Sequence, residues 1–297
     1  MSHLTKYWES NHPDILPENK EKLNEYLLSL KLANKAVSTV SKYRKILEAF
    51  LLETPILVEK LTSDDIRKWL NDFSLGKSEG TIIFYLSVIT QFFNFCLDED
   101  YMDQTIVKKR WRPKLPHSLP KYLDEHEYAR VLLNLEQLSE RDRAIVLFLF
   151  TTGCRVSEVS NLNIEDVNFE KRTVEVVGKG NKLRQSYFSD ECGIVLSAYL
   201  QTRTSLPSDP VFISKFGKRL QPNGIRKVLQ KAGKGANLKQ SLHPHCCRHT
   251  FATNMLARGA DLQFIADVLG HSNLNTTRIY AQIPTEELMV KYQNIMG

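Results

Sequence analysis

The hydrophobic positions of the first hundred residues recur at the three- and four-residue spacing of an α-helix. One apolar stripe occupies residues 23–30 and a second occupies residues 40–50. Residues 62–65 place two acids in a first helical turn ahead of the apolar Ile66, and a further apolar helix covers residues 81–96. The pattern therefore predicts four helices and no strand in this part of the chain.

A basic segment that contains three prolines follows these helices. Prolines resist both helix and sheet, so residues 109–122 are predicted to be a linker. On this basis we expect a helical domain at residues 1–108 and a second domain at residues 123–297.

The pattern of the second domain is mixed. Residues 141–151 are expected to form an apolar helix. In residues 172–177, β-branched side chains recur in an alternating pattern, which predicts a strand. Residues 183–188 are expected to pair back on that strand across a turn at residues 178–181. Helices are expected again towards the end of the chain, including one that Gly270 closes. The predicted fold class is mainly α with a small antiparallel β-sheet, in two domains.

Composition places the chain among ordinary globular proteins. Of its 297 residues, 42% are hydrophobic and 25% are charged, which excludes wholesale disorder. The longest purely apolar run, residues 144–150, is far shorter than the ~20 residues of a membrane span, and no signal peptide is visible. Five unevenly spaced cysteines suit a reducing compartment better than a disulfide framework. We therefore expect a cytoplasmic protein that does not associate with membranes.

Basic residues gather in three blocks that contain no acid. The net charge of +6 is modest, but residues 26–47, 104–123 and 210–260 hold no Asp or Glu. One block of this kind is usually a solvated face, whereas three blocks together favour a nucleic acid as partner. The side chains that we expect to contact DNA are Lys42, Arg44, Lys45, Arg110, Arg112, Lys218, Arg219, Arg226 and Lys227.

Residues 243–250 combine three histidines, two cysteines and an arginine. On a helix, His245 and Arg248 project from one face, and this pairing inside a basic region suits a phosphate oxygen. A histidine satisfied by the backbone is the common alternative for any single position. A zinc site is the other alternative, but the spacing fits none of the usual zinc patterns. We therefore expect no metal.

Four segments carry a specific resemblance. They read TGCRVSEV at residues 152–159, GKGNK at 178–182, HCCRHTFAT at 245–253 and LGHSNLNTTRIY at 269–280. Their order and spacing resemble the tyrosine recombinases, the phage-integrase and Xer-like family. The resemblance covers residues 122–297, and the helical first domain is similar to the core-binding domain of that family.

The resemblance implies a catalytic set and its roles. Tyr280 would be the nucleophile, and Arg155 and Arg248 would clamp the non-bridging phosphate oxygens. His271 would donate a hydrogen bond to the phosphate, while His245 would contact the phosphate or act as general base. Lys179 would be the general acid, with Lys182 as its competitor. Glu158 would support the site, and the chemistry requires no cofactor.

Single residues of this set have ordinary explanations. Taken alone, Tyr280 would more often be a packing residue, and Arg155 could merely pair with Glu158. The signal lies in six residues that occur in order within their local motifs.

The resemblance implies a site-specific recombinase that holds double-stranded DNA between two domains and forms a 3′-phosphotyrosyl intermediate. Exchange between two duplexes needs four protomers, so we expect a homotetramer on DNA. An amphipathic helix that begins at Pro284 is expected to dock into a neighbouring protomer. The alternatives are a type IB topoisomerase-like strand transferase and a non-catalytic DNA-binding protein of the same fold. Integration, excision and resolution all stay open.

Overall fold

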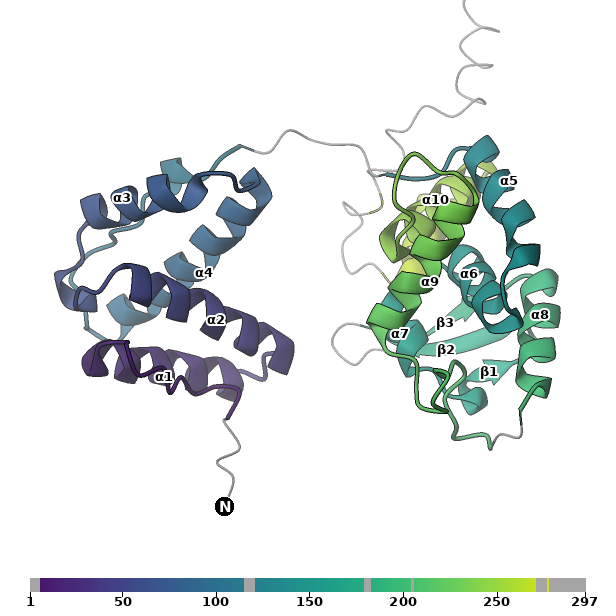
Figure 1. Ribbon diagram of the computed structural model, residues 1–297, viewed down its shortest axis with the longest axis horizontal. Helices are drawn as coiled ribbons and strands as arrows, with labels where there is room; N and C mark the ends of the chain where they lie inside the picture. The colour runs from purple at the N-terminus through teal and green to yellow at the C-terminus, as the bar shows by residue number, and fades with distance from the viewer. Residues whose placement is uncertain (1–5, 115–120, 179–182, 204–205, 271–276, 278–297) are drawn as a thin grey trace, which may run out of the picture. The chain divides into compact units, whose positions relative to one another are not determined.

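The computed structural model describes residues 6–114, 121–178, 183–203, 206–270 and 277. The chain forms two compact units, residues 1–117 and residues 118–297 (Figure 1). Residues 179–181 of the predicted turn and the helix expected from Pro284 lie outside the described residues.

The first unit contains the four predicted helices, which are confirmed. They are α1 (Pro17–Leu32), α2 (Val37–Glu53), α3 (Ser63–Ser74) and α4 (Glu79–Asp98), with 3₁₀ turns η1 (Val58–Lys60) and η2 (Lys109–Trp111). Helix α3 begins with a capping box, because Thr62 accepts from the N–H of Asp65 while the Asp65 carboxylate accepts from the N–H of Thr62. The helices bury one shared core that includes Leu27, Phe50 and Phe92.

Helix α4 has the length and composition to cross a membrane, and it is the one described helix that does. Its buried positions run from Ile82 to Cys96, and they pack into the core of the first unit beside α1 and α2. The helix thus lies at the apolar centre of a helical bundle. A core helix of this kind has the same apolar composition as a helix that crosses a membrane.

The first unit extends beyond the boundary that we predicted at residue 108. Turn η2 follows that boundary, and the ring of Trp111 packs against the core of the first unit. The guanidinium of Arg112 donates to the hydroxyl of Thr90 at 3.3 Å. Residues 109–112, the first part of the predicted linker, therefore fold onto the helices. Burial of the aromatic surface of Trp111 favours this arrangement.

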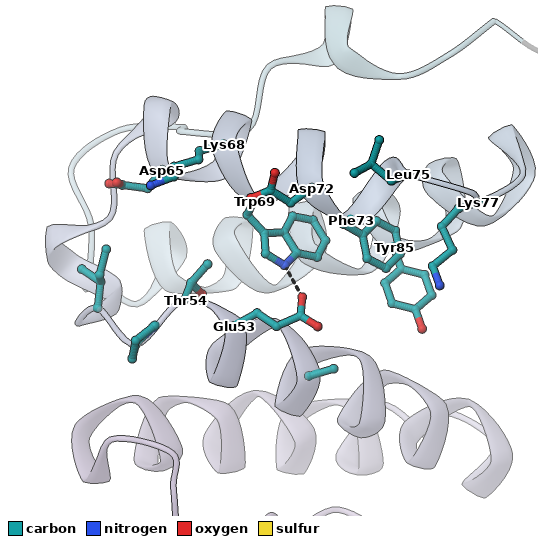
Figure 2. A pocket seen from close by; sticks show the side chains of 13 residues that line it. Glu53, Thr54, Asp65, Lys68, Trp69, Asp72, Phe73, Leu75, Lys77 and Tyr85 are labelled. Atoms are coloured by element: carbon teal, nitrogen blue, oxygen red, sulfur yellow. Dashed lines mark hydrogen bonds between the residues drawn. The ribbon is translucent and has the colours of Figure 1, made fainter.

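A cavity of about 720 Å³ lies between α2, α3 and α4 of the first unit (Figure 2). The indole N–H of Trp69 donates to the Glu53 carboxylate at 2.7 Å, and its ring stacks on Phe73 with centroids 4.8 Å apart. Tyr85 continues this aromatic wall. Carboxylates and ammonium groups both line the cavity, so its charge favours no single class of ligand.

The second unit is mainly helical with one small sheet. Its helices are α5 (Glu125–Asn134), α6 (Glu140–Thr152), α7 (Val156–Asn161), α8 (Asp190–Gln201), α9 (Pro222–Gly235), α10 (Pro244–Ala257) and α11 (Leu262–Leu269), with 3₁₀ turns η3 (Leu135–Gln137) and η4 (Ile164–Asp166). The strands are β1 (Val167–Asn168), β2 (Thr173–Val177) and β3 (Leu183–Tyr187), antiparallel in that order. The predicted hairpin is confirmed as β2 and β3, in the register that pairs Val174 with Ser186. Strand β1 was not predicted, since two residues carry no periodic signal.

Helix α6 is the centre of the second unit. It is buried continuously from Ala144 to Phe150 and packs against α8, α9 and α10. It ends at Gly153, whose φ of +60° is the left-handed conformation that a C-terminal glycine allows. The chain then turns directly into α7, so the end of the most buried helix fixes the position of Arg155.

Candidate active site

Arg155 and Glu158 form the first part of the site, at the start of α7. The backbone N–H of Arg155 donates to one oxygen of Glu158 at 2.7 Å, and the Arg155 guanidinium donates to the other at 2.9 Å. The Glu158 side chain is 2% exposed, whereas that of Arg155 is 31% exposed. A buried carboxylate thus holds an arginine that still reaches the surface.

Helix α10 supplies the second part. His243 caps the helix by accepting the N–H of Cys246 on its Nδ1, and Pro244 occupies the first helical position. His245 and Arg248 follow one turn apart, as predicted. His245 is exposed and Arg248 is buried.

The two predicted arginines meet at the end of α11. Arg248 donates to the carbonyl of Gly153 at 2.7 Å and to that of Leu269 at 2.6 Å. Arg155 donates to the carbonyl of Gly270, the next residue, at 3.4 Å. The C-terminal carbonyls of a helix carry partial negative charge, so they attract guanidinium groups.

A third arginine, which was not among the predicted site residues, lies at the same place. Arg184 of β3 donates to the carbonyl of Val268 and, at 2.7 Å, to Glu158. Three consecutive carbonyls, at Val268, Leu269 and Gly270, therefore each accept from a different arginine. Arg184 stands two residues before Ser186, so the two side chains share one face of β3, and the structure shows that this face is the inner one.

The positive charges of this cluster act on the neighbouring histidines. The pKa of His245 is lowered from its ordinary value, first by desolvation and then by the charges of Arg248, Arg155 and Arg226. The pKa of His249 is lowered to about 4, again mainly by burial. Both imidazoles are consequently neutral near pH 7, and a neutral imidazole can accept a proton.

The structure brings four of the predicted site residues together: Arg155, Glu158, His245 and Arg248. Lys179, Lys182, His271 and Tyr280 lie outside the described residues. In the sequence, His271 directly follows Gly270, and the two lysines fall between the residues of β2 and those of β3.

The predicted DNA contacts divide into two groups. The side chains of Lys42, Lys45, Arg110, Arg112, Lys218, Arg226 and Lys227 are exposed. By contrast, Arg44 donates to the backbone carbonyls of Lys6 and Glu9, and Arg219 donates to those of Ser160 and Leu162. Each of these two arginines folds back onto main-chain oxygens of its own unit, Arg44 near the start of the chain and Arg219 at the end of α7.

The described residues contain no group of three or more His, Cys, Asp or Glu side chains that could hold a metal ion. All five cysteines are buried free thiols, and burial raises the pKa of Cys246 to about 11. Guanidinium groups fixed by main-chain carbonyls can bind the oxygens of a phosphate, and a neutral histidine stands beside them.

Comparison with known proteins gives two family matches. The sequence profile of the "Phage integrase family" matches residues 121–287, and that of the "Phage integrase, N-terminal SAM-like domain" matches residues 23–100. Tyrosine recombinase XerA of Pyrococcus horikoshii is 36% identical over 274 residues, covering 91% of this chain and 92% of the relative. Tyrosine recombinase XerC of Oceanobacillus iheyensis is 33% identical, and the match covers 87% of this chain and 90% of that relative.

Solved structures show the same likeness. The crystal structure of XerA recombinase matches with 28% identity and a TM-score of 0.55, covering 94% of this chain and 99% of that one. The XerH site-specific recombinase bound to a palindromic difH substrate has 20% identity and a TM-score of 0.75, and the match covers 96% of this chain and 90% of that one. The second likeness concerns the fold alone.

Proposed function

The chain belongs to the phage integrase family of tyrosine recombinases, and on that premise we propose that it is a site-specific recombinase, an enzyme that cleaves and rejoins duplex DNA. The observation that carries the proposal is the pair of guanidinium groups, Arg155 and Arg248, which anchor to neighbouring carbonyls at the end of α11. This arrangement suits a phosphodiester whose charge grows as it reacts.

Cleavage requires a nucleophile from the protein, because DNA lacks the 2′-hydroxyl with which RNA can cleave itself. We assign this role to the phenol of Tyr280, which attacks the phosphorus and expels the 5′ oxygen. The products are a 3′-phosphotyrosyl end and a free 5′-hydroxyl. One phosphate ester replaces another, so religation needs neither ATP nor a cofactor.

The proton transfers follow from the same assignment. His245, kept neutral by desolvation and by the adjacent arginines, can accept the phenolic proton or contact the phosphate. Lys179 is our choice of general acid for the leaving oxygen, with Lys182 as its competitor. His271 would donate a hydrogen bond to a phosphate oxygen.

Both units are proposed to contact the DNA. The exposed basic residues of the first unit, such as Lys42 and Lys45, and those of the second, such as Lys218 and Lys227, provide phosphate contacts. The relative XerH was solved on a DNA substrate, which supports a DNA partner for this chain. We place the protein in the cytoplasm, where DNA is available to it and its thiols stay reduced.

Four protomers are needed to exchange strands between two duplexes, since each supplies one tyrosine. We propose that the segment from Pro284 docks into a neighbouring protomer. An apolar groove of about 290 Å³ on the second unit offers a receiving surface, lined by Phe251, Met255 and the partly exposed Phe264. Arg258 also lines the groove, and its charge suits the acids that follow Pro284 in the sequence.

The decisive experiment uses a nicked suicide DNA substrate, which traps the covalent complex. Wild-type protein is expected to form an adduct that survives denaturation, whereas Tyr280→Phe binds the same DNA and forms none. An adduct with Tyr280→Phe would remove Tyr280 from the role of nucleophile. Binding without an adduct by the wild type, on every candidate site, would favour a non-catalytic DNA-binding protein instead.

A further inference from the structure

Arg184 occupies a junction between three elements of the second unit. It extends from β3, its side chain is 10% exposed, and its guanidinium donates to Glu158 of α7 and to the last turn of α11 at Val268. It also lies 3.7 Å from the sulfur of Cys154. Nothing in the proposed chemistry uses this arginine directly, so its burial in the site calls for another explanation.

The carboxylate of Glu158 connects Arg184 to Arg155. Its Oε2 accepts from Arg184 and from the backbone N–H of Arg155, each at 2.7 Å. Its Oε1 accepts from the Arg155 guanidinium at 2.9 Å. Arg184 therefore fixes the rotation of the carboxylate on one side, and the carboxylate fixes the guanidinium of Arg155 on the other. The second contact of Arg155, to the carbonyl of Gly270, is longer at 3.4 Å.

Gly270 fits the same arrangement. Its φ is +65°, and a Cβ built there would lie 2.7 Å from Cδ and 3.0 Å from Nε of Arg184. The stem of Arg184 thus packs directly against the residue that ends α11. Both ends of its guanidinium are held, so this stem cannot move aside easily.

A role in stability alone does not account for Arg184. Its buried Nε–H has no hydrogen-bond partner among the described residues, and an unpaired buried donor is unfavourable. Replacing a buried ion pair by apolar side chains is often neutral or stabilising. What the position of Arg184 does achieve is a simultaneous contact with Glu158 and with the end of α11.

We propose that Arg184 is a positioning residue: it orients Glu158 and the end of α11, so that the guanidinium of Arg155 points at the reacting phosphate. This inference rests on the proposed function. Without Arg184, the Glu158 carboxylate keeps only its two bonds to Arg155. The carboxylate and the Arg155 guanidinium can then turn together, and the charge on the phosphate is neutralised less well.

The test compares Arg184→Met on two nicked suicide substrates. One carries an ordinary phosphodiester at the cleavage position, and the other carries an uncharged methylphosphonate, which needs no neutralising arginine. On the phosphodiester, the rate of adduct formation by folded protein should fall about 10–100-fold, less than the ~10²–10³-fold typical for a lost direct donor. On the methylphosphonate, the loss should shrink to a few-fold.

Arg203→Met is the matched control. Arg203 also has a buried, unpaired Nε, and it donates to the carbonyls of Pro210 and Val211 at 2.5 and 2.9 Å, outside the arginine cluster. We expect it to lower stability and leave the rate per folded molecule unchanged. In addition, Arg184→Met combined with Glu158→Gln should be no slower than the worse single variant, because both act through one carboxylate.

Equal losses on both substrates, or effects of Arg184→Met and Glu158→Gln that multiply, would overturn the positioning role. So would a loss for Arg184→Met that matches the one seen with Arg203→Met. Failure of the proposed function looks different, because wild-type protein would then form no Tyr280-dependent adduct on the phosphodiester.

Discussion

Gly153 lies so close to the ring of Phe251 that a Cβ added to the glycine would be 2.6 Å from Cδ1 of the phenylalanine. The same added carbon would lie 2.8 Å from a methyl group of Leu269. The end of α6 is therefore pressed between α10 and α11, the two helices that carry Arg248 and its carbonyl partner. Packing at this one residue holds the guanidinium cluster together.

Gly153→Ala is expected to destabilise the second unit strongly. Its φ of +60° disfavours any side chain, and the two clashes add an overpacking cost, so we expect a loss of about 2–5 kcal/mol in the free energy of unfolding. Gly217→Ala is the control, because Gly217 has a φ of +70° but open space around it. That variant should lose only about 1–2 kcal/mol. Urea unfolding measures both, and equal losses would refute the packing argument.

Arg248→Lys should impair both stability and cleavage. A lysine carries the charge but lacks the planar fork that reaches the carbonyls of Gly153 and Leu269 together. We expect a loss of about 1–3 kcal/mol in stability and a fall of ~10²–10³ in the rate of adduct formation.

The same exchange at Arg203 separates these effects, since Arg203 also binds two main-chain carbonyls. Arg203→Lys should lower the urea midpoint without changing the cleavage rate of folded protein. A normal cleavage rate in Arg248→Lys would exclude Arg248 from the clamp.

Stability should fall in mildly acidic solution. The pKa of His249 is about 4 in the folded protein, against an ordinary value of 6.5. Between these values the unfolded chain binds a proton that the folded chain does not, so the free energy of unfolding decreases as the pH falls from 6.5 towards 4. One such group contributes a slope of up to about 1.4 kcal/mol per pH unit.

His249→Gln removes this contribution and should flatten the slope. The measurement is urea unfolding at a series of pH values, with His126→Gln at an exposed position of α5 as the control for the substitution itself. An unchanged slope in His249→Gln would show that other groups govern the acid sensitivity.

Truncation after Ile283 tests the proposed docking between protomers. The shortened chain keeps Tyr280 and should still form the covalent adduct on a single site. It should fail to assemble tetramers on DNA, because the segment that would enter the groove beside Phe251 and Phe264 is gone. Gel-shift and light-scattering measurements report the assembly, and tetramers of the truncated chain would refute the docking.

The sequence predicted the elements whose signals are local. The helix start with its acidic first turn at residues 62–65, the apolar stripe of α6 and the alternation of β2 all lie within a few residues, so local signals revealed them. Strand β1 was missed because two residues carry no periodic signal, and the packing of Trp111 was missed because its partners are distant in the sequence.

The same limit applies to the site. Arg155 and Arg248 stand in recognisable motifs, whereas Arg184 is defined by partners 26 and 84 residues away. The contacts of Arg44 and Arg219 are equally non-local. A basic block gives no sign of which arginines turn inward, and these two bind carbonyls up to 38 and 59 residues distant.

The end of α11 has a further consequence. Because three successive carbonyls serve three arginines from three different elements, local unfolding at the end of α11 would remove all three contacts at once. The site is therefore complete or absent as a whole. A population of molecules under mild stress should consist of fully competent and fully incompetent members, with no half-active species between them.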